Sequence, residues 1–163
     1  MITQLSILTA VLDGHADELR STIEAIPLRD ASPFASLSGT HNGRWVVVRP
    51  RPLEPDTYLM CSATIDAPVD VWLDGFLRAL GPTADAIWSH CAGWPASGDA
   101  SRKAAWLAKH RVHPALSFAT WDVPSTTIVE ALSARDRVAR FALRVQGLDA
   151  TALLAAYQEE FSR

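Results

Sequence analysis

Four short runs rich in β-branched and apolar residues, interrupted by two helical patterns, constrain the fold of this chain more than any other feature. Such runs are typical of β-strands, and they lie at residues 2–12, 43–49, 57–65 and 85–91. The first helical pattern follows Asp13 and ends at Pro27, and the second begins near Asp66 and Pro68 and ends near Leu80. A β-α-β-β-α-β order within about 90 residues predicts a ferredoxin-like antiparallel sheet with the spatial strand order 4-1-3-2.

The remaining residues predict a helix-strand-helix-helix tail. We expect a helix near Asp99, a fifth strand over 115–121, a long helix opened by a capping box of Thr127 and Glu130, and a last helix capped by Asp149. Both helices of a ferredoxin-like unit lie on one face of its sheet. The other apolar face must therefore be covered by this tail or by a second copy of the chain.

Composition and charge are those of an ordinary globular protein. Of 163 residues, 48% are hydrophobic and 20% are charged, and the formal net charge is −3. We therefore predict an α+β protein with a single domain over residues 1–163, in which a ferredoxin-like unit (1–95) precedes a mainly helical extension (96–163). Because the chain has no long basic run, nucleic acid is not an expected partner.

The expected compartment is the cytoplasm, with no membrane contact. No run approaches 18 consecutive apolar residues, and the first residues lack the basic start of a signal peptide. Free thiols are then expected for Cys61 and Cys91. The predicted third and fourth strands are separated by the first, which places these cysteines about 9.6 Å apart or more, beyond the roughly 7 Å limit for a disulfide.

Polar residues far apart in the sequence meet at one edge of the predicted sheet. His41 and Arg44 lie at the start of the second strand, Asp66 at the end of the third, and His90 and Cys91 at the end of the fourth. In the antiparallel order 4-1-3-2 these three strand ends share one edge. We therefore predict a functional site at this rim.

Structural roles remain open for each of these residues. His41 is equally consistent with a turn residue, and His90 with a core histidine satisfied by backbone groups. Asp66 stands before Ala-Pro at a helix start, where an aspartate is the expected N-cap. Cys91 fits a small buried apolar residue better than a nucleophile. Arg44 is the most informative, because a guanidinium on an otherwise apolar strand face needs an anion, a carboxylate or water.

Tryptophans and further histidines complete the candidate residues. Trp45, Trp88 and Trp94 either line a cavity or fill the core. His110 and His113 are three residues apart, but the proline after His113 disfavours helix there, so we assign no metal site.

Three segments together resemble a group of mostly uncharacterised bacterial proteins. The segments are "GTHNGRWVVV", "YLMCSATIDAPVDVWLD" and "DAIWSHCAGWP", and the resemblance makes His41, Arg44, Asp66 and His90 the matching positions. The chain departs from the pattern at residue 67, where alanine replaces glycine, and at residue 42, where asparagine replaces an aromatic residue. At fold level the chain is similar to the dimeric α+β barrel superfamily, which includes cofactor-free monooxygenases, polyketide cyclases, chlorite dismutase-like haem proteins and dye-decolorising peroxidases.

The leading functional hypothesis is an enzyme that acts without a cofactor on a small, largely apolar molecule in a cavity on the open sheet face. His90 or His41 would abstract a proton and Arg44 would hold an enolate, phenolate or carboxylate, leading to oxygenation, cyclisation or isomerisation. The expected substrate-binding residues are Asp66, Trp45, Trp88 and Trp94. The alternatives are a haem protein with an axial ligand among His90, His110 and His113, and a non-catalytic binding or accessory module. We expect a homodimer in each case.

Overall fold

The computed structural model describes residues 2–27, 32–49, 56–114 and 122–162. The chain divides into two compact units, Met1–Ser125 and Thr126–Arg163. Residues 96–125 thus group with the first unit. Each unit is described by itself.

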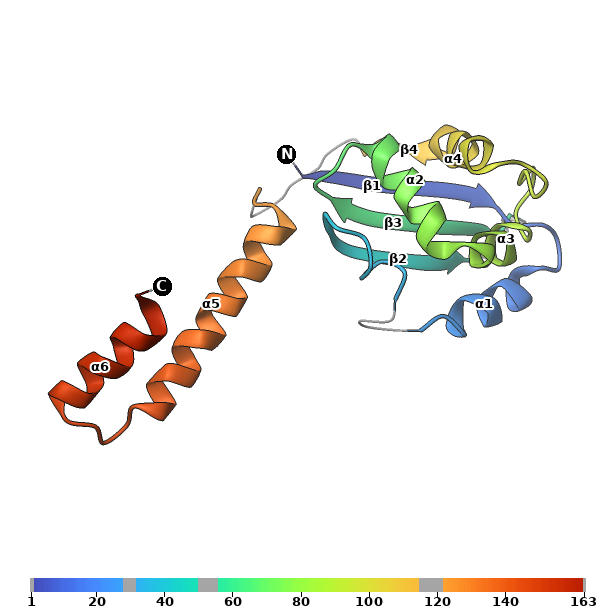
Figure 1. Cartoon of the computed structure of the whole chain (residues 1–163). Coiled ribbons are helices and arrows are strands. Elements are labelled where there is room, and N and C mark those ends of the chain that lie inside the picture. Colours follow the sequence, from blue (N-terminus) through green and yellow to red (C-terminus); the bar gives the residue numbers. More distant parts are fainter. Residues whose placement is uncertain (1, 28–31, 50–55, 115–121, 163) are drawn as a thin grey trace. The chain divides into compact units, whose positions relative to one another are not determined.

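The first unit is built on one open, four-stranded antiparallel sheet in the order β2-β3-β1-β4 (Figure 1). Its strands are β1 (Thr3–Ala10), β2 (Thr40–Val48), β3 (Tyr58–Ile65) and β4 (Arg111–Val112). Side chains alternate between the two faces of a strand, and the apolar positions of β1 follow this period: Leu5 and Ile7 are buried, whereas Leu8 is exposed. The predicted first, second and third strands are confirmed.

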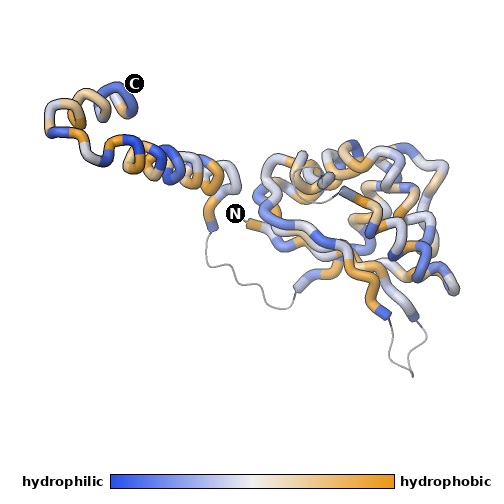
Figure 2. Tube along the Cα trace, turned by 90° about the horizontal axis from the view of Figure 1, so that it is seen from below, coloured by the Kyte–Doolittle hydropathy of each residue, from blue (hydrophilic) through white to orange (hydrophobic). Residues whose placement is uncertain are grey.

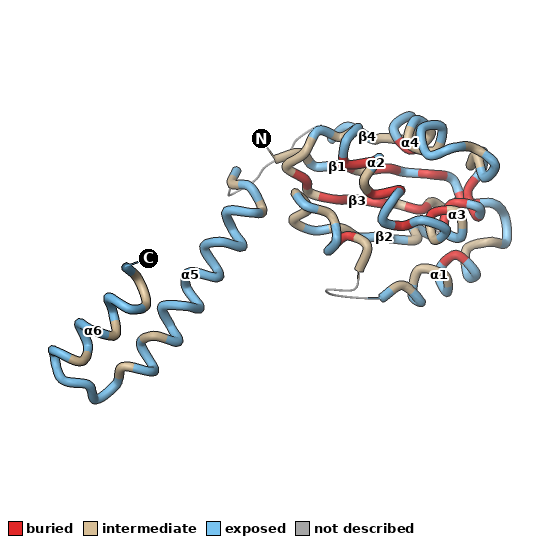
Figure 3. The backbone as a smooth tube through the Cα atoms, in the orientation of Figure 1, coloured by how far each residue is buried: buried red, intermediate tan, exposed pale blue. Residues whose placement is uncertain are grey.

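Helices cover one face of this sheet (Figures 1 and 3). They are α1 (Ala16–Glu24), α2 (Val69–Leu80), α3 (Pro82–Trp88) and α4 (Ala100–Lys109). Leu5, Ile7 and Leu59 of the sheet form one hydrophobic core with buried residues of these helices, among them Leu19 and Phe76. Among the described residues of this unit, no helix lies on the other sheet face (Figure 1).

The predicted strand at 85–91 is wrong. Residues 82–88 form helix α3, in which Ile87 and Trp88 are both fully buried. Gly81, with a φ of 53°, ends α2, and Pro82 stands in the first turn of the next helix, where its missing N–H costs nothing. A short apolar run has no periodicity that separates a strand from a buried helix, so packing against the core decides.

The fourth place in the sheet is taken by a different segment. The short strand β4 pairs with β1 through Ser6↔Val112 and Ile7↔Arg111. The predicted order 4-1-3-2 therefore holds when β4 is the fourth strand. The predicted strand at 115–121 lies outside the described residues.

Helix starts agree with the sequence at two of four aspartates, Asp99 and Asp149, and differ at Asp13 and Asp66. Asp99 caps α4 by accepting a hydrogen bond from the Arg102 N–H at 2.9 Å, as expected. Helix α1 differs, because its N-cap is His15 rather than Asp13, and this N-cap makes no side-chain hydrogen bond to the helix. Asp66 does not cap α2 either, since Pro68 occupies that N-cap position.

The second unit is a pair of helices. Helix α5 (Ser125–Arg144) starts at the end of the first unit, and α6 (Ala150–Phe161) is capped by Asp149, as predicted. The two helices contact each other through an aromatic cluster of Phe141, Tyr157 and Phe161. Neither helix has a buried residue, and apolar residues remain exposed along both (Figure 2). Among the described residues, no helix is long and apolar enough to cross a bilayer.

Candidate functional site

The open face of the sheet is polar at one end. Two cross-strand rows of polar side chains, one of Gln4, Thr64 and Asn42 and one of Ser6, Ser62 and Arg44, follow from the strand registers. These residues line a shallow depression of about 500 Å³. The Arg44 Nε–H donates to the Ser62 Oγ at 3.1 Å, which holds the guanidinium over the sheet.

The rest of the same face is apolar. Leu8, Val46, Val48 and Val112 are 37–46% exposed there. The face is therefore divided between a polar half that contains one arginine and an apolar half that water contacts.

His41 and Asp66 form a buried pair at the polar end of the sheet. The pairing of β2 with β3 shifts register between Thr40 and Asn42, which makes His41 the extra residue of a β-bulge. Bulges redirect side chains, and His41 Nε2 lies 3.4 Å from Asp66 Oδ1, with the two side chains only 13% and 11% exposed. Both atoms are buried, and neither has a well-oriented hydrogen-bond partner among the described residues.

The other carboxylate oxygen of Asp66 binds Ser125. Oδ2 accepts hydrogen bonds from the Ser125 N–H at 2.6 Å and from its hydroxyl at 3.0 Å. Burial of the carboxyl raises its pKa, but the Ser125 hydrogen bonds and the nearby His41 more than offset this and leave the pKa of Asp66 below its ordinary value. Because Asp66 lies between Ser125 and His41, the hydroxyl does not contact the imidazole and Ser125 lacks the base that a serine nucleophile needs.

Three of the residues predicted for the rim lie at this end of the sheet, and two lie at the other end. His41, Arg44 and Asp66 are at the start of β2 and the end of β3. His90 and Cys91 follow α3, and Cys91 pairs with Val11, just past the end of β1. Eight residues of strand separate Val11 from Thr3, about 27 Å, so the prediction that His90 shares this rim is wrong.

The predicted tryptophans lie on the helical side of the sheet. Trp45 is next to Arg44 in β2 and therefore faces the opposite side of the sheet. There its ring centroid lies 4.4 Å from that of Phe34. Trp88 is fully buried in α3 and stacks on Trp94 at 5.6 Å. None of the three lines the polar depression, and Trp88 lies at the end of helix α3 instead of in the predicted strand over 85–91.

The cysteines are free, as predicted, and both are buried. Burial raises the pKa of the Cys61 thiol to about 12. Burial also raises the pKa of Cys91, against the smaller opposing effect of the Thr9 hydroxyl at 3.3 Å. Neither thiol is activated as a nucleophile.

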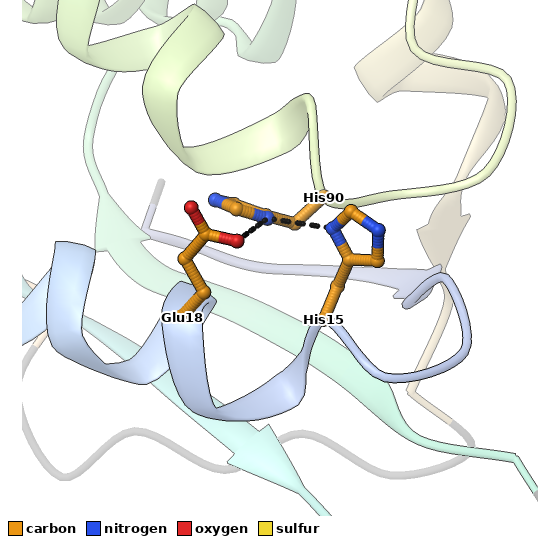
Figure 4. Close-up of side chains that lie close together, drawn as sticks. All are labelled: His15, Glu18 and His90. Atoms are coloured by element: carbon orange, nitrogen blue, oxygen red, sulfur yellow. Dashed lines mark hydrogen bonds and ion pairs between the residues drawn. The ribbon is translucent and has the colours of Figure 1, made fainter.

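A second polar cluster contains two residues that sequence reasoning missed. His15 and Glu18, at the start of α1, face His90 in the turn after α3 (Figure 4). The two histidine Nδ1 atoms are 3.0 Å apart, and His90 Nδ1 is 4.0 Å from Glu18 Oε2. The three-residue spacing of His15 and Glu18 at a helix start predicts that these two side chains are neighbours. Their proximity to His90 depends on tertiary packing.

No protein-family model, curated protein or solved structure matches this chain. The resemblance to uncharacterised bacterial proteins therefore stays a prediction, and the chemistry of the site rests on its own geometry.

Proposed function

We propose that this protein binds a small organic carboxylate in the polar depression on the open sheet face. The observation that carries the proposal is the position of Arg44, a guanidinium set among hydroxyl and amide side chains on three adjacent strands. Arginine binds carboxylates through paired, charge-assisted hydrogen bonds. The polar lining favours an anionic group over the largely apolar substrate that the sequence suggests.

The division of the face also limits the shape of the ligand. Leu8 and Val46 lie one row beyond the polar residues and are exposed to water. A ligand with a carboxylate over Arg44 and an apolar body over these residues would bury apolar surface as well as pair its charge. An aromatic or medium-chain carboxylic acid fits this description.

The same proposal includes proton transfer by His41. Its Nε2 lies 3.4 Å from Asp66 Oδ1, and this pairing would orient the ring for a role as acid or base. His41 does not line the depression itself but precedes Asn42, which does. The proposed reaction class is proton abstraction from the bound acid, with His41 in the role that the sequence divides between His41 and His90.

The proposed fold assignment is ferredoxin-like, with a homodimer of the dimeric α+β barrel kind. The strand order and the helices on one face support the first part. In such a dimer the polar depression would become part of an enclosed cavity, where an ion pair is stronger than in water.

Binding can be tested by thermal unfolding of the full chain with benzoate and octanoate, and with benzyl alcohol and octanol as neutral controls. We expect the carboxylates alone to raise the melting temperature. Arg44→Gln should abolish the rise, whereas Arg78→Gln, an exposed arginine of α2, should keep it. Equal shifts from acids and alcohols, or an unchanged response in Arg44→Gln, would refute the proposal.

Catalysis needs a separate measurement. His41→Gln should leave carboxylate binding intact but stop exchange of the acid's α-protons with deuterated water, measured by NMR with phenylacetate as the probe. Binding without exchange in the unmodified protein would leave the function as a non-catalytic binding module.

A further inference from the structure

We infer that His15, Glu18 and His90 bind a divalent transition-metal ion. The site lies at the opposite end of the sheet from the carboxylate site, and the inference does not depend on the proposed function. It rests on how the local structure brings three ligand-bearing side chains together (Figure 4).

The first two ligands come from the start of α1. Gly14 takes a positive φ of 78°, which turns the chain sharply after the first strand and places His15 at the N-cap of α1. The His15 side chain makes no capping bond to the helix, so its ring is available to another partner. Glu18 stands three residues later, and residues at this spacing are neighbours on one helix face.

The third ligand is held by the backbone. The Leu12 N–H donates to the His90 carbonyl at 2.8 Å, and the Ala92 N–H donates to the Ala10 carbonyl at 2.9 Å. These bonds join the turn after α3 to the segment that leads into α1. His90 is only 8% exposed, so its ring has a defined position facing His15.

The distances suit one ion. Two ligand atoms each about 2.0–2.2 Å from a tetrahedral metal ion lie about 3.3–3.6 Å from each other. The two Nδ1 atoms are already 3.0 Å apart, and all three ligand atoms lie within 4.8 Å of one another. Glu18 has to move by roughly 1 Å toward the two histidines, which a 74% exposed side chain can do.

The surrounding charges are compatible with a cation. The start of α1 carries the positive end of the helix dipole, which opposes a bound cation, but Asp17 and Glu18 both lie in this first turn. Asp17 pairs with Arg49, which leaves Glu18 to neutralise the ion. Two imidazoles and one carboxylate suit zinc and iron(II), and three protein ligands leave a position open for water, as in catalytic zinc sites.

The competing explanation is a histidine pair that shares one proton through a hydrogen bond. The two explanations predict different metal binding, because only a metal site takes up one ion per chain. The test uses the untagged full chain, stripped with a chelator and titrated with Co²⁺ while its visible absorption is recorded, followed by displacement with Zn²⁺. We expect one equivalent of Co²⁺ to give a saturable spectrum that one equivalent of Zn²⁺ removes.

Variants identify the ligands. His15→Gln and His90→Gln should each weaken binding by at least the roughly 10–100-fold that loss of an outer-shell partner costs, and Glu18→Gln should weaken it too. His113→Gln, which removes an exposed histidine elsewhere, should leave the titration unchanged. Circular dichroism of each variant checks its folding. If His90→Gln does not fold, the titration of His15→Gln decides the result, because His15 is only partly buried.

Either of two results would overturn the inference: no saturable Co²⁺ spectrum, or a spectrum that His15→Gln leaves unchanged. Arg44→Gln should bind Co²⁺ normally, and His15→Gln should still respond to carboxylates. The two proposed sites can therefore fail separately.

Discussion

Asp66 contacts the chain at two places that no local pattern connects. One carboxylate oxygen faces His41, and the other accepts both hydrogen bonds from Ser125. An aspartate before a proline near a helix start predicts an N-cap, but the bond to Ser125, 59 residues away, competes with that role. The hydrogen-bond partners of this residue are therefore set by the groups that the fold places beside it, not by its neighbours in the sequence.

Asp66→Asn should lower the free energy of unfolding at pH 7 by about 1.5–3 kcal/mol, because it weakens hydrogen bonds to a charged group. The folded-state pKa of Asp66 is lowered, so its contribution is present above the ordinary pKa of 3.8 and is lost as the pH falls through the lowered value. The difference in free energy of unfolding between the unmodified protein and Asp66→Asn, measured by urea unfolding, should therefore shrink in acid. Asp74→Asn, at an exposed position of α2, should change stability by less than about 0.5 kcal/mol. A difference that stays constant down to acid pH would contradict this account.

The two cysteines should be unreactive in the folded protein. Burial raises the pKa of Cys61 to about 12 and also raises that of Cys91, so few thiolates exist near pH 8. Ellman's reagent should react slowly with the native chain and should titrate two thiols in guanidinium without reductant. Cys61→Ala should leave one thiol that titrates in guanidinium. Rapid reaction in the native state, or fewer than two thiols after unfolding, would count against the buried free thiols.

At the scale of elements, helix α3 and strand β4 differ most from the sequence expectation. The run over 85–91 has the composition of a strand, but Gly81 and Pro82 start a helix whose Ile87 and Trp88 reach the core. The sheet then receives its fourth strand from Arg111–Val112, only two residues long. Short elements carry little local signal, so non-local packing selects their conformation.

Two glycines give a matched test of element packing. A Cβ on Gly43 of β2 would meet the Phe34 ring at 2.2 Å, and that ring is itself packed on Trp45 and Phe76. Gly43→Ala should therefore cost about 1–3 kcal/mol through overpacking. Gly75→Ala in α2, where the nearest atom lies 3.4 Å away, should gain about 0.5–1 kcal/mol. Urea unfolding of both variants measures the contrast, and effects of the same sign would contradict it.

At the scale of the whole molecule, the core belongs to one of the two units. In the part of the chain that the structure describes, the buried core residues lie between Leu5 and Leu107, whereas α5 and α6 contribute none. The first unit therefore holds the apolar contacts that a cooperative fold requires.

A chain that ends at Ser125 should fold. We expect cooperative thermal unfolding, followed by circular dichroism, at a midpoint close to that of the full chain. A chain that ends at Asp99 should not fold, because it loses β4 and the fully buried Leu107. Failure of the longer fragment would show that the core needs residues beyond Ser125.

The full chain should self-associate, since exposed apolar residues lie on the open sheet face and along α5 and α6. Light scattering should give twice the 17.7 kDa mass of one chain. Comparison with the Ser125 fragment locates the interface: a dimeric fragment assigns it to the first unit, and a monomeric fragment assigns it to the helical pair. A monomeric full chain would contradict the expected homodimer.

The sequence by itself determined the elements that carry their own pattern. Runs of β-branched and apolar residues predicted β1, β2 and β3, because such side chains fit an extended, half-buried backbone. Asp99 and Asp149 marked two helix starts, because capping bonds act over three residues. The same local reading placed His41 and Asp66 at one strand edge, since both lie at the ends of these strands.

Only the tertiary structure decided the rest. It made residues 82–88 a helix, gave the fourth sheet position to β4 and brought His90 to His15 across 75 residues. Each of these depends on contacts between segments far apart in the chain, whose free energy comes from burial in a common core and leaves no local trace in the sequence.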